Sequence, residues 1–187
     1  MRSVDDPTSL RALAHPLRVR LLALLREAGP ATATELAAQL ETESGSTSYH
    51  LRVLARHGFV ADAPSGGRRH HRERRWAAVD RLSSWSNTAL AATPAGREAS
   101  ALMRRRQVEV LIGDVDAFEA ALGSLDAPWV EVSGIGDLLV RLSPASVTAL
   151  WERFYAQLDE LVRHDATDPA ASPVSVVVAA FPRMPRP

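Results

Sequence analysis

The residues best suited to binding chemistry lie in a short basic run in the first half of the chain. Five arginines and two histidines fall within Arg68–Arg75, directly after the turn-forming pair Gly66-Gly67. Guanidinium groups bind phosphate through paired hydrogen bonds, so the run is suited to a polyanion. If it forms a hairpin beside a duplex, part of it can reach phosphates or the minor groove. The residues expected to do so are Arg68, Arg69, Arg72 and Arg74.

A second set of polar side chains falls within a helix expected over residues 44–57. Leu51 and Leu54 mark its apolar face, while hydroxyl and guanidinium groups gather on the other face and at its beginning. A helix fits the major groove of DNA, and side chains near its N-terminus reach base edges. The residues expected to contact DNA are Ser46, Thr47, Tyr49, His50, Arg52 and Arg56. An alternative stays open: Ser46 and Thr47 cap the helix, and His50 packs at the core edge.

Residue types argue against an enzyme and against a metal centre. The chain has no cysteine, which excludes disulfides, thiolate metal sites and cysteine nucleophiles. It also has no lysine and no Gly-x-Ser-x-Gly sequence, so neither a phosphate-binding loop nor a nucleophile elbow is present. His70 and His71 are adjacent in an expected strand and would point to opposite faces. We therefore expect no catalytic residue, cofactor or metal.

The net charge of zero hides an asymmetry along the chain. Residues 1–81 hold 13 arginines and 9 acidic residues, whereas residues 82–187 hold 9 arginines and 13 acidic residues. A basic half joined to an acidic half indicates that one end meets a polyanion.

The elements expected before residue 80 follow a simple order. Short helices are expected over residues 8–14, from Pro16 to the Gly29-Pro30 break, over residues 35–39, and over residues 44–57. Gly58 ends the last of these, and strand-like segments flank the turn at 64–67, so that the basic run forms a wing over 64–76. Helices followed by a two-stranded hairpin are the order of a winged helix.

Two motifs in this region resemble those of the ArsR family of transcriptional repressors. The segment Leu10–Leu25 is similar to the opening of that family. Ser48, His50, Leu51, Leu54 and Gly58 match its recognition-helix pattern Ser-x-His-Leu-x-x-Leu-x-x-x-Gly. The resemblance covers about 70 residues and implies a winged helix-turn-helix that binds palindromic duplex DNA as a homodimer and represses transcription.

The sequence after residue 80 predicts a long helix followed by a small α/β element. A long helix is expected over about 94–125, with Thr93 as its cap and a coiled-coil-like apolar seam. Strand, helix and strand are expected over about 137–181, and a disordered tail over 182–187. The fold class is therefore mainly α with α+β elements, divided into a DNA-binding domain (1–80) and a C-terminal dimerisation or effector region (81–187). The seam residues expected at the dimer interface are Val108, Leu111, Val115, Phe118 and Leu122, although packing on the chain's own C-terminal element stays open.

Double-stranded DNA and a second copy are the expected partners, and a small-molecule effector is left open. The aromatic residues Trp129, Trp151, Phe154 and Tyr155 suit either an apolar pocket or, more simply, a core. No signal peptide or apolar span is visible, so we expect a cytoplasmic protein away from the membrane. Two other readings remain: a winged helix used for protein–protein interaction, and a metabolite sensor acting through the C-terminal element.

Overall fold

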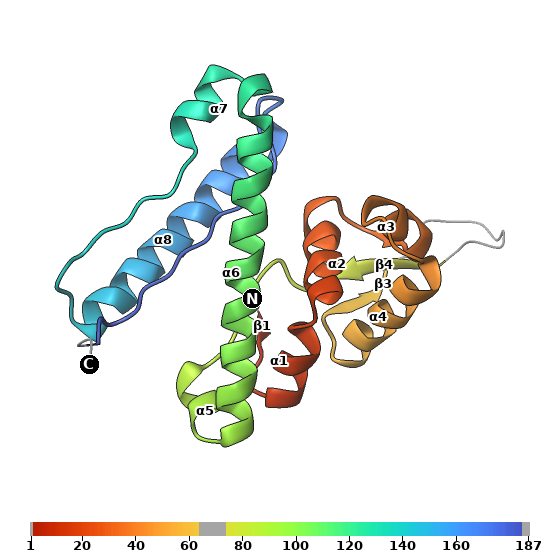
Figure 1. The fold of residues 1–187 in the computed structure, drawn as a ribbon, viewed down its shortest axis with the longest axis horizontal. Coiled ribbons are helices and arrows are strands. Elements are labelled where there is room, and N and C mark those ends of the chain that lie inside the picture. Colours follow the sequence, from red (N-terminus) through yellow and green to blue (C-terminus); the bar gives the residue numbers. More distant parts are fainter. Residues whose placement is uncertain (1, 64–73, 185–187) are drawn as a thin grey trace. The chain divides into compact units, whose positions relative to one another are not determined.

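The computed structural model describes residues 2–63 and 74–184. The chain divides into two compact units, residues 1–113 and 114–187. The first contains strands and helices in the order of a winged helix, and Figure 1 shows α2, α3 and α4 grouped around the strands β3 and β4. Its helices are α1 (Pro7–Leu13), α2 (Pro16–Glu27), α3 (Ala33–Gln39), α4 (Ser44–Arg56), α5 (Asn87–Ala91) and the first part of α6 (Pro94–Ala121).

Two small sheets complete the first unit. The strands β2 (Ala31–Thr32), β3 (Val60–Asp62) and β4 (Arg75–Ala78) form an antiparallel sheet in the order β2-β4-β3. The strands β1 (Arg2–Ser3) and β5 (Ser83–Ser84) pair in parallel. The expected pairing on either side of the turn is therefore confirmed, while the wing tip at 64–73 lies outside the described residues.

Local capping explains why the helices begin where they do. Asp6 accepts hydrogen bonds from the backbone N–H groups of Thr8 and Ser9 at the start of α1. At α3, the Thr32 hydroxyl accepts from the Glu35 N–H and the Glu35 carboxylate accepts from the Thr32 N–H, which is a capping box. Each pair satisfies backbone donors that a helix start leaves unpaired.

Residues in the left-handed backbone conformation follow the helices α2, α3 and α4. Gly29 (φ 82°) follows α2 and Gly58 (φ 70°) follows α4, as their positions in the sequence indicate. The turn between α3 and α4 uses Glu41 at φ 52°, a conformation that glycine adopts at lower cost. Sequence reasoning did not single out Glu41.

The core is built mainly from leucines. Leu10, Leu21, Leu36, Leu51 and Leu54 are almost completely buried and join α1, α2, α3 and α4. Trp76 of β4 closes the sheet side of the same cluster. Burial of this apolar surface is the main favourable term in forming the unit.

The sequence predicted a domain boundary at residue 80, but the buried core continues beyond it. Leu90 of α5 and Ala99 and Met103 of α6 belong to the same buried cluster as Leu10. The hydroxyl of Thr93 accepts from the Gly96 N–H at 3.0 Å, which confirms the expected cap of the long helix. The unit therefore extends to residue 113 because α5 and the first turns of α6 supply one wall of its core.

The second unit is helical, with long irregular stretches. It holds the end of α6, the short 3₁₀ helix η1 (Leu122–Ser124), α7 (Ala127–Val132), α8 (Pro144–His164) and the 3₁₀ helix η2 (Asp165–Thr167). The mainly α fold class with α+β elements and the helix over 94–121 are confirmed, and α8 matches the helix expected in this region. The helix α7 was not predicted.

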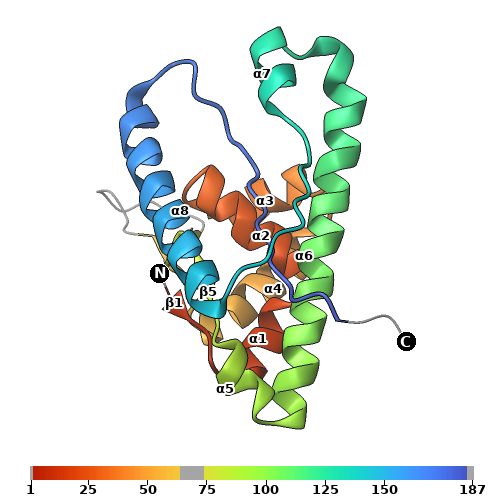
Figure 2. The same ribbon diagram turned by 90° about the vertical axis from the view of Figure 1, so that its left-hand side faces the viewer.

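The two strands expected around α8 do not form in the described chain. Leu138–Leu142 and Val174–Phe181 are extended, and neither segment has a backbone hydrogen bond to another described residue. Neither segment is drawn with a strand arrow (Figures 1 and 2). The prediction of strand, helix and strand was therefore wrong for the strands, because a strand requires a paired neighbour and not only a suitable sequence.

The contact between α5 and α6 makes a prediction about Gly96. A Cβ at this position would lie 2.1 Å from the backbone oxygen of Leu90, whereas a Cβ at Gly113, in the same helix, would meet nothing within 4 Å. We expect Gly96→Ala to lower the free energy of unfolding by about 3 kcal/mol. Gly113→Ala should raise it by about 1 kcal/mol through helix propensity. Chemical denaturation of both variants checks this, and equal effects would show that α5 does not pack closely on α6.

Candidate nucleic-acid interface

The helix α4 has one buried face and one exposed face. Thr47, Leu51 and Leu54 point into the core, and because they recur at helical spacing the opposite face is left outward. Tyr49 is 56% exposed, and Arg52 and Arg56 are also exposed. Ser46 and His50 are half-buried at the borders. No acidic residue occurs within α4 itself.

Thr47 is the member of the predicted contact set that the structure contradicts. Its side chain is completely buried, and its Oγ1 has no hydrogen-bond partner among the described residues. It cannot touch DNA without unfolding of α4. The DNA-contact prediction was wrong for Thr47 because its methyl group placed it on the apolar face, where the core took the whole side chain.

One flank of α4 holds a shallow hollow between α4 and the sheet. Ser48, Arg52 and Arg74 line it together with Ala33 and Trp76. The Arg74 guanidinium lies 3.7 Å from the centroid of the Trp76 ring and also pairs with the Asp62 carboxylate. These two contacts hold Arg74 in place beside Arg52.

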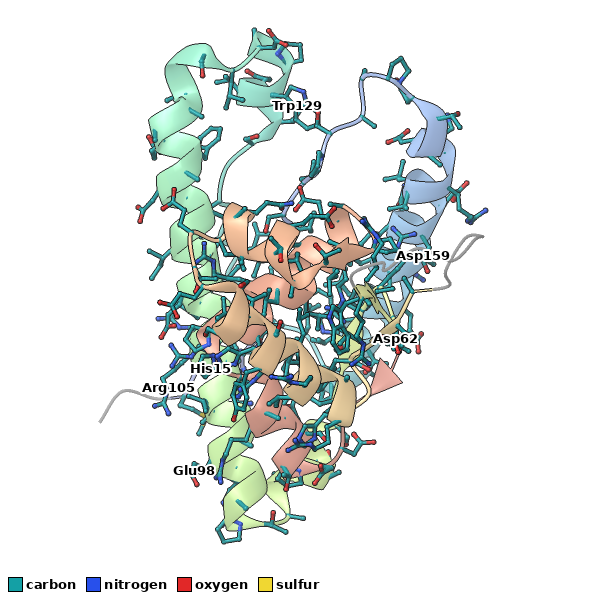
Figure 3. The ribbon with its side chains drawn as sticks, turned by 90° about the vertical axis from the view of Figure 1, so that its right-hand side faces the viewer. His15, Asp62, Glu98, Arg105, Trp129 and Asp159 are labelled. Atoms are coloured by element: carbon teal, nitrogen blue, oxygen red, sulfur yellow. The ribbon has the colours of Figure 1, made fainter. Side chains whose placement is uncertain are left out.

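The other flank of α4 holds a cluster of basic groups. The rings of His15 and His50 stack with centroids 4.4 Å apart, and Tyr49 meets His50 edge-on at 5.2 Å. The Arg18 guanidinium lies 3.3 Å from Nδ1 of His50. Figure 3 looks onto this face and shows His15 and Asp62 on opposite sides of α4.

A backbone hydrogen bond fixes the protonation state of His15 in this cluster. Nδ1 of His15 accepts from the Leu17 N–H at 3.2 Å and caps α2, so the ring is neutral and carries its proton on Nε2. Burial lowers the pKa of His15, and the charges of Arg18 and Arg106 and the neighbouring His50 ring, which a proton on His15 would have to face, lower it further. Burial and Arg18 likewise lower the pKa of His50. The free protein therefore presents two neutral imidazoles beside an arginine.

Several other arginines near α4 have structural partners. Arg18 also donates through Nε to the carbonyl of Ala12, and Arg75 pairs with Glu35. Arg26 donates to the carbonyl of Asp80 at 2.9 Å and so ties α2 to the chain after β4. Being an arginine is therefore not enough to mark a residue of this unit as a DNA contact.

The other residues singled out in the sequence are those of the wing, the apolar seam of the long helix and the C-terminal aromatic residues. Arg68, Arg69 and Arg72 of the wing lie outside the described residues. Val108 of α6 and Leu122 at the start of η1 are exposed, while the seam residues between them are half-buried. The aromatic residues of α8 stack edge-on, with Trp151 and Phe154 centroids 6.4 Å apart and Phe154 and Tyr155 centroids 5.4 Å apart. That stacking fits side-chain packing along one helix.

The described part of the chain holds neither a cluster of metal-ligating side chains nor a membrane-spanning helix. In residues 2–63 and 74–184, no three His, Asp or Glu side chains gather as a metal site would need. No helix in those ranges is both long and apolar enough to cross a membrane.

Comparison with known families supports the helix-turn-helix geometry. Residues 13–62 match a family described as a helix-turn-helix domain. This segment covers α2, β2, α3, α4 and β3, so it includes α4 together with the two helices that pack against it. No curated protein matches the chain. The first unit therefore carries a helix-turn-helix domain of the kind that DNA-binding regulators use.

The unpaired hydroxyl of Thr47 predicts a stabilising substitution. Thr47→Val keeps the shape of the side chain and removes a buried polar group without a partner, so it should raise the free energy of unfolding by about 1 kcal/mol. Thr32 is the matched control: it is also buried, but its hydroxyl accepts the capping bond at α3. Thr32→Val should lower stability by about 1 kcal/mol. Urea denaturation checks both, and a loss of stability in Thr47→Val would contradict the assignment.

The neutral cap at His15 predicts a pH dependence of stability. Because the pKa of His15 is lower in the folded chain than in the unfolded one, the unfolded state takes up protons first as the pH falls. The stabilisation is therefore fully present above about pH 6.5 and declines below it. His15→Asn keeps a capping acceptor without a titrating ring, so its melting temperature should fall less than that of the wild type between pH 7.5 and pH 5.5. An unchanged pH dependence would show that His15 is not the group responsible.

Proposed function

We propose that this protein is a sequence-specific transcriptional regulator of the ArsR type, which binds palindromic DNA as a homodimer. The observation that carries the proposal is the outward face of α4, which bears Tyr49, Arg52 and Arg56 and no carboxylate. A helix with such a face can enter the major groove with its N-terminal half toward base edges.

The two flanks of α4 suit the two phosphate backbones that border a major groove. Arg52 and Arg74 lie on the sheet side, and Arg18 lies with His15 and His50 on the other side. Phosphate contacts on both sides would fix the orientation of α4, while Ser46, Tyr49 and His50 read bases. The wing arginines Arg68, Arg69 and Arg72 would extend the sheet-side contacts along the backbone.

The ArsR assignment rests on the two sequence motifs, and repression follows from it. A dimer that occupies a promoter would exclude polymerase, and two copies of α4 would read half-sites about one helical turn apart. A protein-interaction module would instead need an apolar outer face on α4, which the exposed arginines argue against. The chemistry of the site contains no arrangement for catalysis, and we propose a non-enzymatic protein.

A binding experiment with matched variants tests the proposal. The purified protein should bind duplex DNA from upstream of its own gene more tightly than unrelated duplex at two salt concentrations. Arg52→Ala should weaken binding about tenfold at low salt and make the slope of log K against log salt less steep by about 0.9, because one phosphate contact is lost.

Arg163→Ala is the control, since it removes an exposed arginine of α8 in the other unit. It should leave the affinity unchanged. Equal loss of affinity in both variants would indicate a general charge effect. Wild-type protein that binds neither duplex at low salt would rule out the DNA-binding function.

A further inference from the structure

The two histidines beside α4 each present the Nδ1 atom of their ring to a donor. Nδ1 of His15 accepts from the backbone N–H of Leu17 at 3.2 Å, and Nδ1 of His50 lies 3.3 Å from the Arg18 guanidinium. A guanidinium carries donors and no acceptor, so Arg18 contacts Nδ1 of His50 favourably only while that nitrogen carries no proton. Both contacts therefore favour the neutral form of the ring.

The two rings differ in what a proton on Nδ1 would disrupt. At His15 it would break the capping bond at the start of α2, which is part of the fold. At His50 it would displace only the terminal N–H groups of Arg18. The Arg18 side chain would stay anchored, because its Nε donates to the carbonyl of Ala12. His50 is therefore the ring that can take up a proton without loss of a backbone hydrogen bond.

The charged and titratable groups that face His50 are an arginine and a phenol. Arg18 reaches it from α2, and Tyr49, its neighbour on α4, meets its ring edge-on at 5.2 Å. Burial and the charge of Arg18 both lower the pKa of His50. Within residues 2–63 and 74–184, no carboxylate forms an ion pair with His15, Arg18 or His50. The free site therefore holds a positive charge that no anion balances, beside an imidazole kept neutral.

The charged groups of α1 and α6 next to the site are paired. Arg106 of α6, whose charge helps to lower the pKa of His15, forms an ion pair with Glu109 of the same helix. Arg11 of α1 pairs with Glu98 of α6 at 2.7 Å. The charge left without a counter-ion on this flank of α4 is therefore that of the arginine on α2.

We propose that Arg18 binds one phosphate of the DNA backbone on this flank, and that His50 takes up a proton as the phosphate enters. The inference rests on the proposed function and adds a proton to its binding reaction. A phosphodiester oxygen draws the terminal N–H groups of Arg18 away from Nδ1 of His50. A proton from solvent then occupies the freed Nδ1, because the charge of the phosphate favours the imidazolium form.

The rest of the cluster keeps its role when His50 is charged. Nε2 of His50 is a donor in both forms of the ring, so its contact with a base edge is retained. The His15 ring, whose centroid lies 4.4 Å from that of His50, stays neutral as its stacking partner because its Nδ1 caps α2.

Proton uptake gives DNA binding a pH dependence of definite sign. The free site disfavours the imidazolium form of His50 and the phosphate-bound site favours it, so the complex holds more protons than the free protein. Affinity for DNA therefore rises as the pH falls through the range around about 6.5 in which imidazoles titrate. The stability that the His15 cap provides changes in the opposite direction over the same range.

Fluorescence anisotropy with the duplex from upstream of the gene, at pH 7.5 and pH 6.0 and constant ionic strength, tests the proposal. The dissociation constant at pH 7.5 divided by that at pH 6.0 should be about fivefold larger in the wild type than in His50→Asn, which keeps an acceptor for Arg18 without a titrating ring. His57→Asn is the matched control, because His57 is also half-buried but its Nδ1 lies 3.0 Å from the hydroxyl of Ser9. It should keep the wild-type ratio. Equal ratios in the wild type and His50→Asn would overturn the proposal.

The other histidines of the first unit are separated by their own variants. His70 and His71 of the wing lie outside the described residues, and imidazoles titrate in this pH range. The fivefold difference made by His50→Asn should therefore persist in a His70→Asn/His71→Asn background. His15→Asn should also keep the wild-type ratio for DNA binding. Loss of the ratio in His15→Asn but not in His50→Asn would overturn the assignment of the proton to His50.

Calorimetry measures the proton itself. Titration with the duplex at pH 6.5, in two buffers of different ionisation enthalpy, should show that the wild type takes up about half a proton more per subunit than His50→Asn. His50→Gln is the second variant, and melting at pH 7.5 shows which of the two is folded. Preferential binding of the upstream duplex without this uptake would overturn the inference and leave the DNA-binding function standing. Binding of neither duplex at either pH would overturn both.

Discussion

The arrangement of the helices in the first unit depends on the leucine core beneath α4. Leu51 and Leu54 fasten one side of α4 to α1, α2 and α3, and this leaves the other side outward with Tyr49, Arg52 and Arg56. The same core receives Leu90 and Met103 from α5 and α6. The helix α4, which is proposed to read DNA, and the helix α6, which leads to the C-terminal unit, are therefore fixed to one cluster of side chains, so a change in that cluster would affect both.

Arginine serves two physical purposes in this unit. Arg26 and Arg106 donate to the backbone carbonyls of Asp80 and Ala14, where they hold separate segments together. Arg52 and Arg56 project from α4 and are exposed. Since all 22 basic residues of the chain are arginine, the residue type alone cannot separate these purposes. The hydrogen-bond partners of each arginine in the folded chain do separate the two purposes. A guanidinium that donates to backbone carbonyls has fewer N–H groups left to donate to a phosphate.

The two units solve the problem of burial differently. The first buries leucines from the five helices α1 to α5 within one chain, and the starts of α1, α2 and α3 are capped by Asp6, His15 and Thr32. The second has a capped helix in α8 but no buried residue among those described. Local signals such as the Ser143 cap were sufficient to begin α8, whereas a core also requires packing between separate surfaces. Operator binding by a two-fold dimer would link the units, since the spacing of the two α4 helices depends on how the copies pair.

The sequence by itself determined most of what is local in this protein. Helical spacing, proline and glycine positions and the Thr93 cap predicted α1 to α4, the long α6 and α8, because these features act over three or four residues. Of the predicted contact residues on α4, all but Thr47 remained accessible. Tertiary structure decided the rest: that Thr47 is buried, that the core continues to α6, that His15 stacks on His50, and that Val174–Phe181 makes no backbone hydrogen bond with another described residue. Each of these depends on which surfaces meet, and that is settled by packing between residues distant in the chain.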